Sequence, residues 1–167
     1  MSSKNENPTR VLVADDDQSI RQLLCTIVRR EGLGVDCASD GFEAIDCLRE
    51  NDYAVILLDL MMPRANGFEV IDYLKAHPPA EKPVVLVITA YADQRFKEVD
   101  ADIVAGVIRK PFEVAELGNI VRLCVAGFDE EIATHLAASR DAHIRQVAQQ
   151  LRYGAFVKSP RDGSANN

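Results

Sequence analysis

Short apolar segments alternate with segments of helical spacing between residues 10 and 127. The apolar segments are rich in β-branched residues, and they predict buried strands at 11–14, 53–58, 84–88 and 106–108, with a weaker strand at 34–38. Between them, apolar side chains recur every three or four positions, which predicts helices around 20–28, 44–48, 68–74, 93–99 and 113–125. Five alternations of strand and helix favour an α/β fold, a doubly wound five-stranded parallel sheet with helices on both faces.

The pattern changes after Gly127. Asp129 can cap a new helix, and its apolar positions between Ile132 and Leu151 fall in one arc that Arg140 interrupts. The polar end of the chain is typical of a disordered tail. We therefore expect one domain, an added C-terminal helical extension and a tail, over residues 1–127, 128–153 and 154–167 respectively.

The net charge of the chain limits the kinds of partner that it can bind. The chain has 167 residues and a formal net charge of −7, which argues against binding nucleic acid or an anionic membrane. All of this charge lies in residues 1–127, which hold 14 basic and 21 acidic residues. The first residues lack an apolar signal core, and no run reaches the ~18 apolar residues of a membrane span. We expect a soluble cytoplasmic protein.

The cysteines give no metal or redox motif. Cys25, Cys37, Cys47 and Cys124 form no C-x-x-C pair, and the three histidines are not near them at metal-ligand spacing. The sequence therefore predicts free thiols in a reducing cytosol.

Polar residues follow the predicted strands at one edge of the sheet. The first strand is followed by three aspartates that begin at Asp15, and the third by Asp59. If these strands are neighbours, their carboxylates converge at the carboxyl edge and repel one another unless a cation binds. Oxygen ligands suit Mg²⁺. Thr89 and Lys110 end the fourth and fifth strands, and a hydroxyl and an ammonium there could hold a phosphoryl oxygen.

Each of these residues alone has an ordinary structural explanation, because strand-end aspartates often only cap a helix or solvate a turn. Their coincidence at one edge favours a site. The segments VLVADDD, ILLDLMMPRANGFEVI, VVLVITAY and GVIRKPF resemble the response-regulator receiver domain, over about residues 9–127. That resemblance implies a flavodoxin-like sheet with strand order 2-1-3-4-5.

The resemblance also implies a role for each site residue. Asp59 matches the phosphoacceptor, and Asp15 and Asp16 match the acidic pair that binds Mg²⁺ or another divalent cation such as Mn²⁺. The backbone carbonyl of Met61 matches a further metal ligand. Two more positions match residues that contact the phosphoryl group, the switch hydroxyl Thr89 and the lysine Lys110.

The implied partners are a sensor histidine kinase or a histidine phosphotransfer protein as phosphoryl donor, and a downstream protein or a second copy of the chain as target. The implied activity is signalling, with self-catalysed phosphoryl transfer and dephosphorylation only. Receivers commonly carry an output domain, but about 40 residues after Gly127 are too few for a winged helix. The extension is therefore expected to pack on its own receiver, to dimerise or to dock a partner.

One position departs from the family pattern. Three residues before Lys110 the family usually has Tyr or Phe, whose ring swings inward with the threonine, whereas this chain has Val107. Val107 has no ring to hide or expose, so aromatic coupling at this position is not expected, whereas Tyr91, two residues past Thr89, could offer a replacement aromatic on the same face.

Two alternatives remain open. An atypical receiver could act as an interaction module without phosphorylation, which Val107 weakly favours. A haloacid-dehalogenase-type phosphatase is the second, since Asp15-x-Asp17 followed by Ser19 loosely imitates its nucleophile motif. That family also needs an acidic pair at a strand end after the lysine, and no such strand is predicted.

Overall fold

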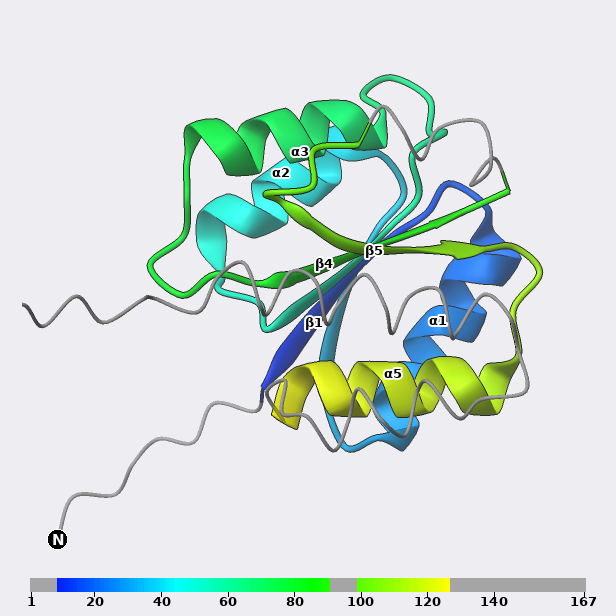
Figure 1. Ribbon diagram of the computed structural model, residues 1–167. Helices are drawn as coiled ribbons and strands as arrows, with labels where there is room; N and C mark the ends of the chain where they lie inside the picture. The colour runs from blue at the N-terminus through cyan, green and yellow to red at the C-terminus, as the bar shows by residue number, and fades with distance from the viewer. Residues whose placement is uncertain (1–8, 91–98, 127–167) are drawn as a thin grey trace, which may run out of the picture.

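A parallel five-stranded sheet forms the centre of the computed structural model, which describes residues 9–90 and 99–126 (Figure 1). The elements, in chain order, are β1 (Arg10–Ala14), α1 (Gln18–Arg30), β2 (Gly34–Ala38), α2 (Gly41–Glu50), β3 (Val55–Leu58), α3 (Gly67–Ala76), β4 (Val84–Thr89), β5 (Val104–Arg109) and α5 (Val114–Ala126). From β1 to β4, strands and helices alternate along the chain as the hydrophobic pattern predicts.

The strand order is β2-β1-β3-β4-β5, which confirms the predicted doubly wound topology. β1 pairs in parallel with β3, and Ala14 lies opposite Leu58 in the register. The backbone N–H of Asp59 donates to the carbonyl of Ala14 at 2.9 Å, so the pairing continues one residue beyond β3. The loops after β1 and β3 therefore leave the sheet side by side.

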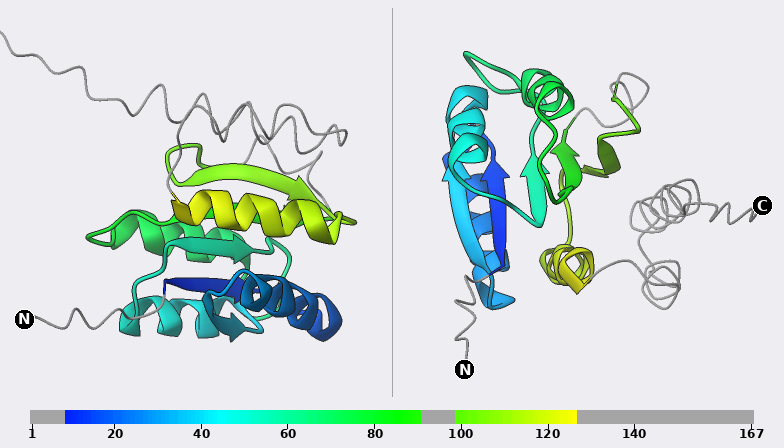
Figure 2. Two further views of the ribbon diagram at one scale, coloured as in Figure 1. Left: turned by 90° about the horizontal axis from the view of Figure 1, so that it is seen from below. Right: turned by 90° about the vertical axis from the view of Figure 1, so that its left-hand side faces the viewer.

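The helices cover both faces of the sheet (Figure 2). Helices α1 and α5 lie on one face, and α2 and α3 on the other (Figure 1). Successive strand residues point to opposite faces, so Val11 and Val13 pack toward α1 and α5 while Leu12 and Ala14 pack toward α2 and α3. Both faces of β1 are buried, which explains its uninterrupted apolar sequence.

Three helices begin with a side-chain cap directly after a loop at the carboxyl edge of the sheet. The side chain of Asp17 accepts the N–H groups of Ser19 and Ile20 at the start of α1. Asp40 caps α2, and Asn66 forms a capping box at the start of α3. These caps fix where each loop ends and its helix begins.

The predicted elements differ from the observed ones mainly at their ends. The weakest expected strand, at 34–38, coincides with β2, whereas β3 begins later than predicted and β5 extends over Val104–Arg109. The helix expected over 93–99 falls almost entirely on residues 91–98, outside the described part of the chain. The expected extension over 128–153 and tail over 154–167 also lie outside it. Within the described residues, no helix has the length and apolar character that crossing a membrane requires.

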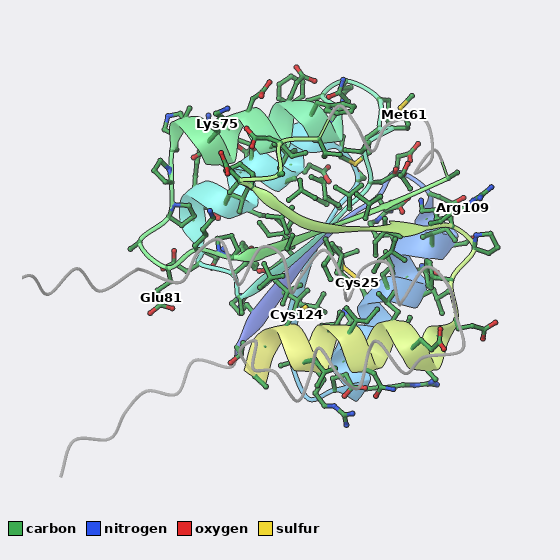
Figure 3. All side chains as sticks on the ribbon, viewed as in Figure 1. Cys25, Met61, Lys75, Glu81, Arg109 and Cys124 are labelled. Atoms are coloured by element: carbon green, nitrogen blue, oxygen red, sulfur yellow. A yellow bond between two sulfur atoms is a disulfide. The ribbon has the colours of Figure 1, made fainter. Side chains whose placement is uncertain are left out.

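The prediction of four free thiols was wrong for two of them, because Cys25 of α1 and Cys37 of β2 form a disulfide. Their spacing in the chain gave no signal, since it is the packing of α1 beside β2 that brings the two residues together. Cys47 and Cys124 are free. Burial raises the pKa of the Cys124 thiol to about 12, so this thiol is a core residue (Figure 3).

Candidate functional site

Three carboxylates meet at the carboxyl edge of the sheet. Asp15 and Asp16 follow β1, Asp59 follows β3, and one carboxylate oxygen from each lies within 4.8 Å of the others. Asp15 and Asp59 are buried, whereas Asp16 is exposed. The predicted convergence of these residues is confirmed, and it follows from the β1–β3 pairing.

Lys110 joins two members of the cluster. Its Nζ donates to Asp15 Oδ2 at 2.7 Å and to Asp59 Oδ2 at 3.1 Å. The lysine comes from the end of β5, where its backbone N–H also donates to the carbonyl of Thr89 at 3.0 Å. A cis peptide bond joins Lys110 to Pro111. Burial by itself would lower the pKa of the Lys110 ammonium, but the carboxylates of Asp15 and Asp59 raise it above its ordinary value.

Backbone N–H groups hold the second oxygen of both buried carboxylates. Asp15 Oδ1 accepts the N–H of Asp17 at 3.0 Å, and Asp59 Oδ1 accepts the N–H of Met61 at 3.2 Å. Each of these bonds spans two residues, so the loop itself orients the carboxylate that it carries. The side chain of Met61 is 43% exposed and projects from the loop at the edge of the molecule (Figure 3).

The charge of the cluster suits a divalent cation. Three carboxylates and one ammonium leave two excess negative charges when all are ionised. Burial raises the pKa of Asp15, and the bonds from Lys110 offset only part of this effect. An all-oxygen donor set with one exposed member, Asp16, leaves room for water ligands, as Mg²⁺ and Mn²⁺ prefer. The residues present therefore fit the metal that the sequence suggested.

Thr89 and Val107 lie on the last two strands. Thr89 ends β4 and is fully buried. Val107 is 9% exposed and packs in the core on the α2–α3 face of the sheet, together with Val87 of β4. Val107 is therefore a core residue of the edge strand β5, paired with β4 and carrying no polar group toward the acidic cluster.

Asp17 takes no part in the acidic cluster. Its carboxylate accepts the N–H groups at the start of α1, at 2.8 Å from Ser19 and 3.0 Å from Ile20. The phosphatase alternative takes Asp17 as the second acid of an Asp-x-Asp motif, and the observed cap gives this residue a structural role instead.

Two arginines near the site were missed by the sequence reasoning. Arg21 of α1 donates from one guanidinium nitrogen to the backbone carbonyl of Asp15 at 2.7 Å and of Asp16 at 3.3 Å. Arg64, in the loop between β3 and α3, pairs with Asp40. The only signal for the second pair was Asp40 followed three residues later by Glu43, a spacing typical of a helix start.

Comparison with known proteins agrees with this geometry. The family model of the response regulator receiver domain matches residues 11–122. The response regulator MprA of Mycobacterium sp. strain KMS is 32% identical over 91% of this chain, which covers 68% of MprA. The DNA-binding response regulator MtrA of Mycobacterium tuberculosis strain H37Rv is 35% identical over 77% of this chain, which covers 55% of MtrA.

A solved structure is similar as well. The response regulator TrrA of Thermotoga maritima, in complex with Mg²⁺ and BeF, is 28% identical, with a TM-score of 0.61. The similarity covers 70% of this chain and 98% of TrrA. Fold, site and sequence agree, and the chain belongs to the response regulator receiver domain family.

Proposed function

We propose that this protein is a response regulator that accepts a phosphoryl group on Asp59 in the presence of Mg²⁺ and then switches a protein-interaction surface. The observation that carries the proposal is the pair of bonds from Lys110 to Asp15 and Asp59, inside a cluster of carboxylates. This arrangement joins an acceptor carboxylate, a cation-binding acid and a fixed ammonium in one place. Phosphoryl transfer needs these groups positioned together more than it needs covalent catalysis.

The reaction follows from the positions of these groups. An oxygen of the Asp59 carboxylate attacks the phosphorus of a phosphohistidine, the N–P bond breaks as the O–P bond forms, and the imidazole leaves and takes up a proton. The Lys110 ammonium lies 3.1 Å from Asp59 Oδ2, within reach of an oxygen of the arriving phosphoryl group. Asp15 and Asp16, with the backbone carbonyl of Met61, would hold the metal beside Asp59. Mg²⁺ bound there would neutralise charge on the phosphoryl oxygens.

The output is a rearrangement near the end of β4. A phosphoryl group on Asp59 brings about −1.5 to −2 charges and strong acceptor oxygens to a buried position. The hydroxyl of Thr89 can donate to such an oxygen, which would draw the end of β4 and the neighbouring β5 inward. Since Val107 supplies no aromatic ring, this response depends on the strands themselves.

The donor is a phosphohistidine of a sensor histidine kinase or a histidine phosphotransfer protein, and the target is a downstream protein or a second copy of the chain. TrrA supports the metal, since its structure holds Mg²⁺ with BeF. That no nucleic acid is bound stays a prediction, because MtrA is a DNA-binding regulator of which this chain covers 55%. The cytoplasmic location also stays a prediction.

Labelling with a small acyl phosphate tests the proposal. The full chain is incubated with ³²P-acetyl phosphate and Mg²⁺, and the bound label is measured together with its lability to hydroxylamine. We expect label on the wild type and on the control Asp52→Asn, which alters an exposed aspartate, and none on Asp59→Asn. Full labelling of Asp59→Asn would refute the acceptor.

The same assay tests the alternative of a receiver that acts without phosphorylation. A wild type that takes up no label with Mg²⁺, while still binding its partner, would favour that alternative over ours. The position of Val107 in the core is its only support among the described residues, whereas the complete cluster around Lys110 opposes it.

A further inference from the structure

One buried acid of the molecule has no part in the site described above. Within residues 9–90 and 99–126, four polar or charged side chains are buried, of which Asp15, Asp59 and Thr89 belong to the site and Asp40 does not. Asp40 is 2% exposed. A buried carboxylate needs hydrogen bonds or a countercharge, so the partners of Asp40 indicate its role.

Asp40 connects two segments of the chain. One oxygen accepts the N–H of Glu43 at 2.9 Å and caps α2, and the other pairs with the guanidinium of Arg64. Arg64 belongs to the loop between β3 and α3, and its side chain is 61% exposed. Its φ of 65° is unusual for a residue other than glycine, so the loop takes a conformation that surrounding contacts must maintain.

The backbone reinforces this connection. The N–H of Gly41 donates to the carbonyl of Ala65 at 2.8 Å, and a Cβ at Gly41 would lie 2.5 Å from that same oxygen. At the other end of the loop, the N–H of Gly67 donates to the carbonyl of Leu60 at 3.0 Å. The segment between these bonds contains Met61, so the start of α2 and the start of α3 together hold the loop that carries the expected carbonyl ligand.

We propose that Asp40 and Arg64 are positioning residues for the divalent cation, because their ion pair fixes the loop that contains Met61, whose N–H donates to Asp59. This inference rests on the proposed function and adds to it a determinant of metal affinity outside the metal ligands. Residues that orient the ligands of a metal commonly change its affinity about 10- to 100-fold. The ion pair acts less directly, through the loop, so we expect its loss to lower the affinity for Mg²⁺ about three- to tenfold.

Long-range electrostatics predicts a different result for one of the two residues. Arg64→Gln removes a positive charge near an acidic cluster, which by Coulomb's law alone strengthens the binding of a cation. If the ion pair positions the loop, the same variant binds Mg²⁺ more weakly. Asp40→Asn also weakens binding, and asparagine keeps the helix cap because it is as good a cap as aspartate.

The experiment measures the Kd of Mg²⁺ on the full chain by isothermal titration calorimetry, and the thermal midpoint in buffer without divalent cations. The variants are Arg64→Gln, Asp40→Asn, their combination and Arg64→Lys. We expect Arg64→Gln and Asp40→Asn each to weaken Mg²⁺ binding about three- to tenfold. The double variant should lose no more affinity than the single variant with the larger loss, and Arg64→Lys should keep most of the wild-type affinity. The control Arg122→Gln removes an exposed arginine of α5, on the other face of the sheet from α2 and α3, and should leave the Kd unchanged.

Other outcomes overturn the inference. An Arg64→Gln variant with an unchanged or lower Kd, or a control that weakens binding as much as the variants, shows that the pair does not position the loop. A lower thermal midpoint with an unchanged Kd shows a role in stability alone. The failure of the proposed function is separate, because it shows as a wild type that binds no Mg²⁺ or as labelled Asp59→Asn.

Discussion

The first residue of α3, Gly67, offers the sharpest test of how closely the site is packed. A Cβ placed on Gly67 would lie 2.7 Å from the Cα of Leu60 and nearer still to the carbonyl oxygen of Asp59. Cβ atoms essentially never approach other atoms closer than 3.0 Å. Both neighbours are backbone atoms of the loop that carries Asp59, so neither can rotate out of the way. Gly67→Ala must therefore move either α3 or the end of β3.

The magnitude follows from two opposing effects. Adding a carbon to a closely packed region costs about 1–3 kcal/mol, and rigid backbone neighbours place this position at the upper end. Alanine recovers up to about 1 kcal/mol of helix propensity in a helix interior, but less at the first position of α3. We expect Gly67→Ala to lower the free energy of unfolding by about 2 kcal/mol and the thermal midpoint by about 4–8 °C.

Gly118 provides the matched control. It lies inside α5, where an added Cβ would meet the side-chain oxygen Oε1 of Glu31 at 3.0 Å and Cγ2 of Ile27 at 3.5 Å. The first neighbour is the end of a flexible side chain, and the second distance is an ordinary contact. Gly118→Ala should therefore leave the free energy of unfolding unchanged or raise it by up to about 1 kcal/mol.

Urea denaturation followed by circular dichroism, in buffer without divalent cations, gives both free energies of unfolding. Calorimetric titration with Mg²⁺ then shows whether the displaced loop also weakens the cation site, which we expect for Gly67→Ala only. If Gly67→Ala is as stable as the wild type and binds Mg²⁺ equally well, the close approach of α3 to Asp59 does not exist in solution. Equal losses of unfolding free energy in Gly67→Ala and Gly118→Ala would show that the close backbone contacts at Gly67 do not cause the effect.

Three further predictions concern other parts of the domain. Asp36 accepts hydrogen bonds from Arg10 and from the hydroxyl of Tyr53, and these bonds hold the pKa of Asp36 below the ordinary 3.8. Asp36→Asn should therefore lower the free energy of unfolding by about 1 kcal/mol at pH 7, and this loss should vanish as the pH falls through the lowered pKa. Equal losses at pH 7 and pH 3 in urea titrations would contradict this. Because Cys25 and Cys37 are joined, a thiol reagent should detect two thiols per denatured chain before reduction and four after it, and four before reduction would disprove the bond. Mg²⁺ at a hundred times its Kd should stabilise the wild type by about 2.7 kcal/mol and Asp15→Asn far less, as thermal unfolding can show.

The fold was largely predictable because burial on both faces leaves a strong signal. A strand such as β3, whose four residues are all fully buried, must be wholly apolar, and helices that cover a sheet must carry one apolar stripe. The weaker β2 is an edge strand with one exposed and three half-buried residues, and its sequence is accordingly mixed. Element ends were less certain, since they depend on single hydrogen bonds. The pairing of Ala54 with Arg10 before β3 is one such bond.

The acidic site was predictable for a topological reason. Parallel strands end at one edge, so polar residues that follow neighbouring strands must meet there, whatever lies between them in the chain. No comparable topological rule predicts the disulfide. Cys25 lies on a helix and Cys37 on a strand, and only the packing of α1 beside β2 determines that they meet.

The connection between Asp40 and Arg64 shows what the sequence alone cannot supply. Each residue has a sufficient local explanation, a helix cap for Asp40 and a loop cation for Arg64, so neither predicts the other. Their meeting depends on α2 and α3 packing on the same face of the sheet, and on Gly41 allowing the backbone of Ala65 to approach. The convergence of Asp15, Asp16 and Asp59 follows from strand order, whereas the position of the loop that contains Met61 depends on helix packing on one face. The proposed positioning role therefore predicts that a substitution at the start of α2 changes cation affinity without altering any of the three clustered aspartates.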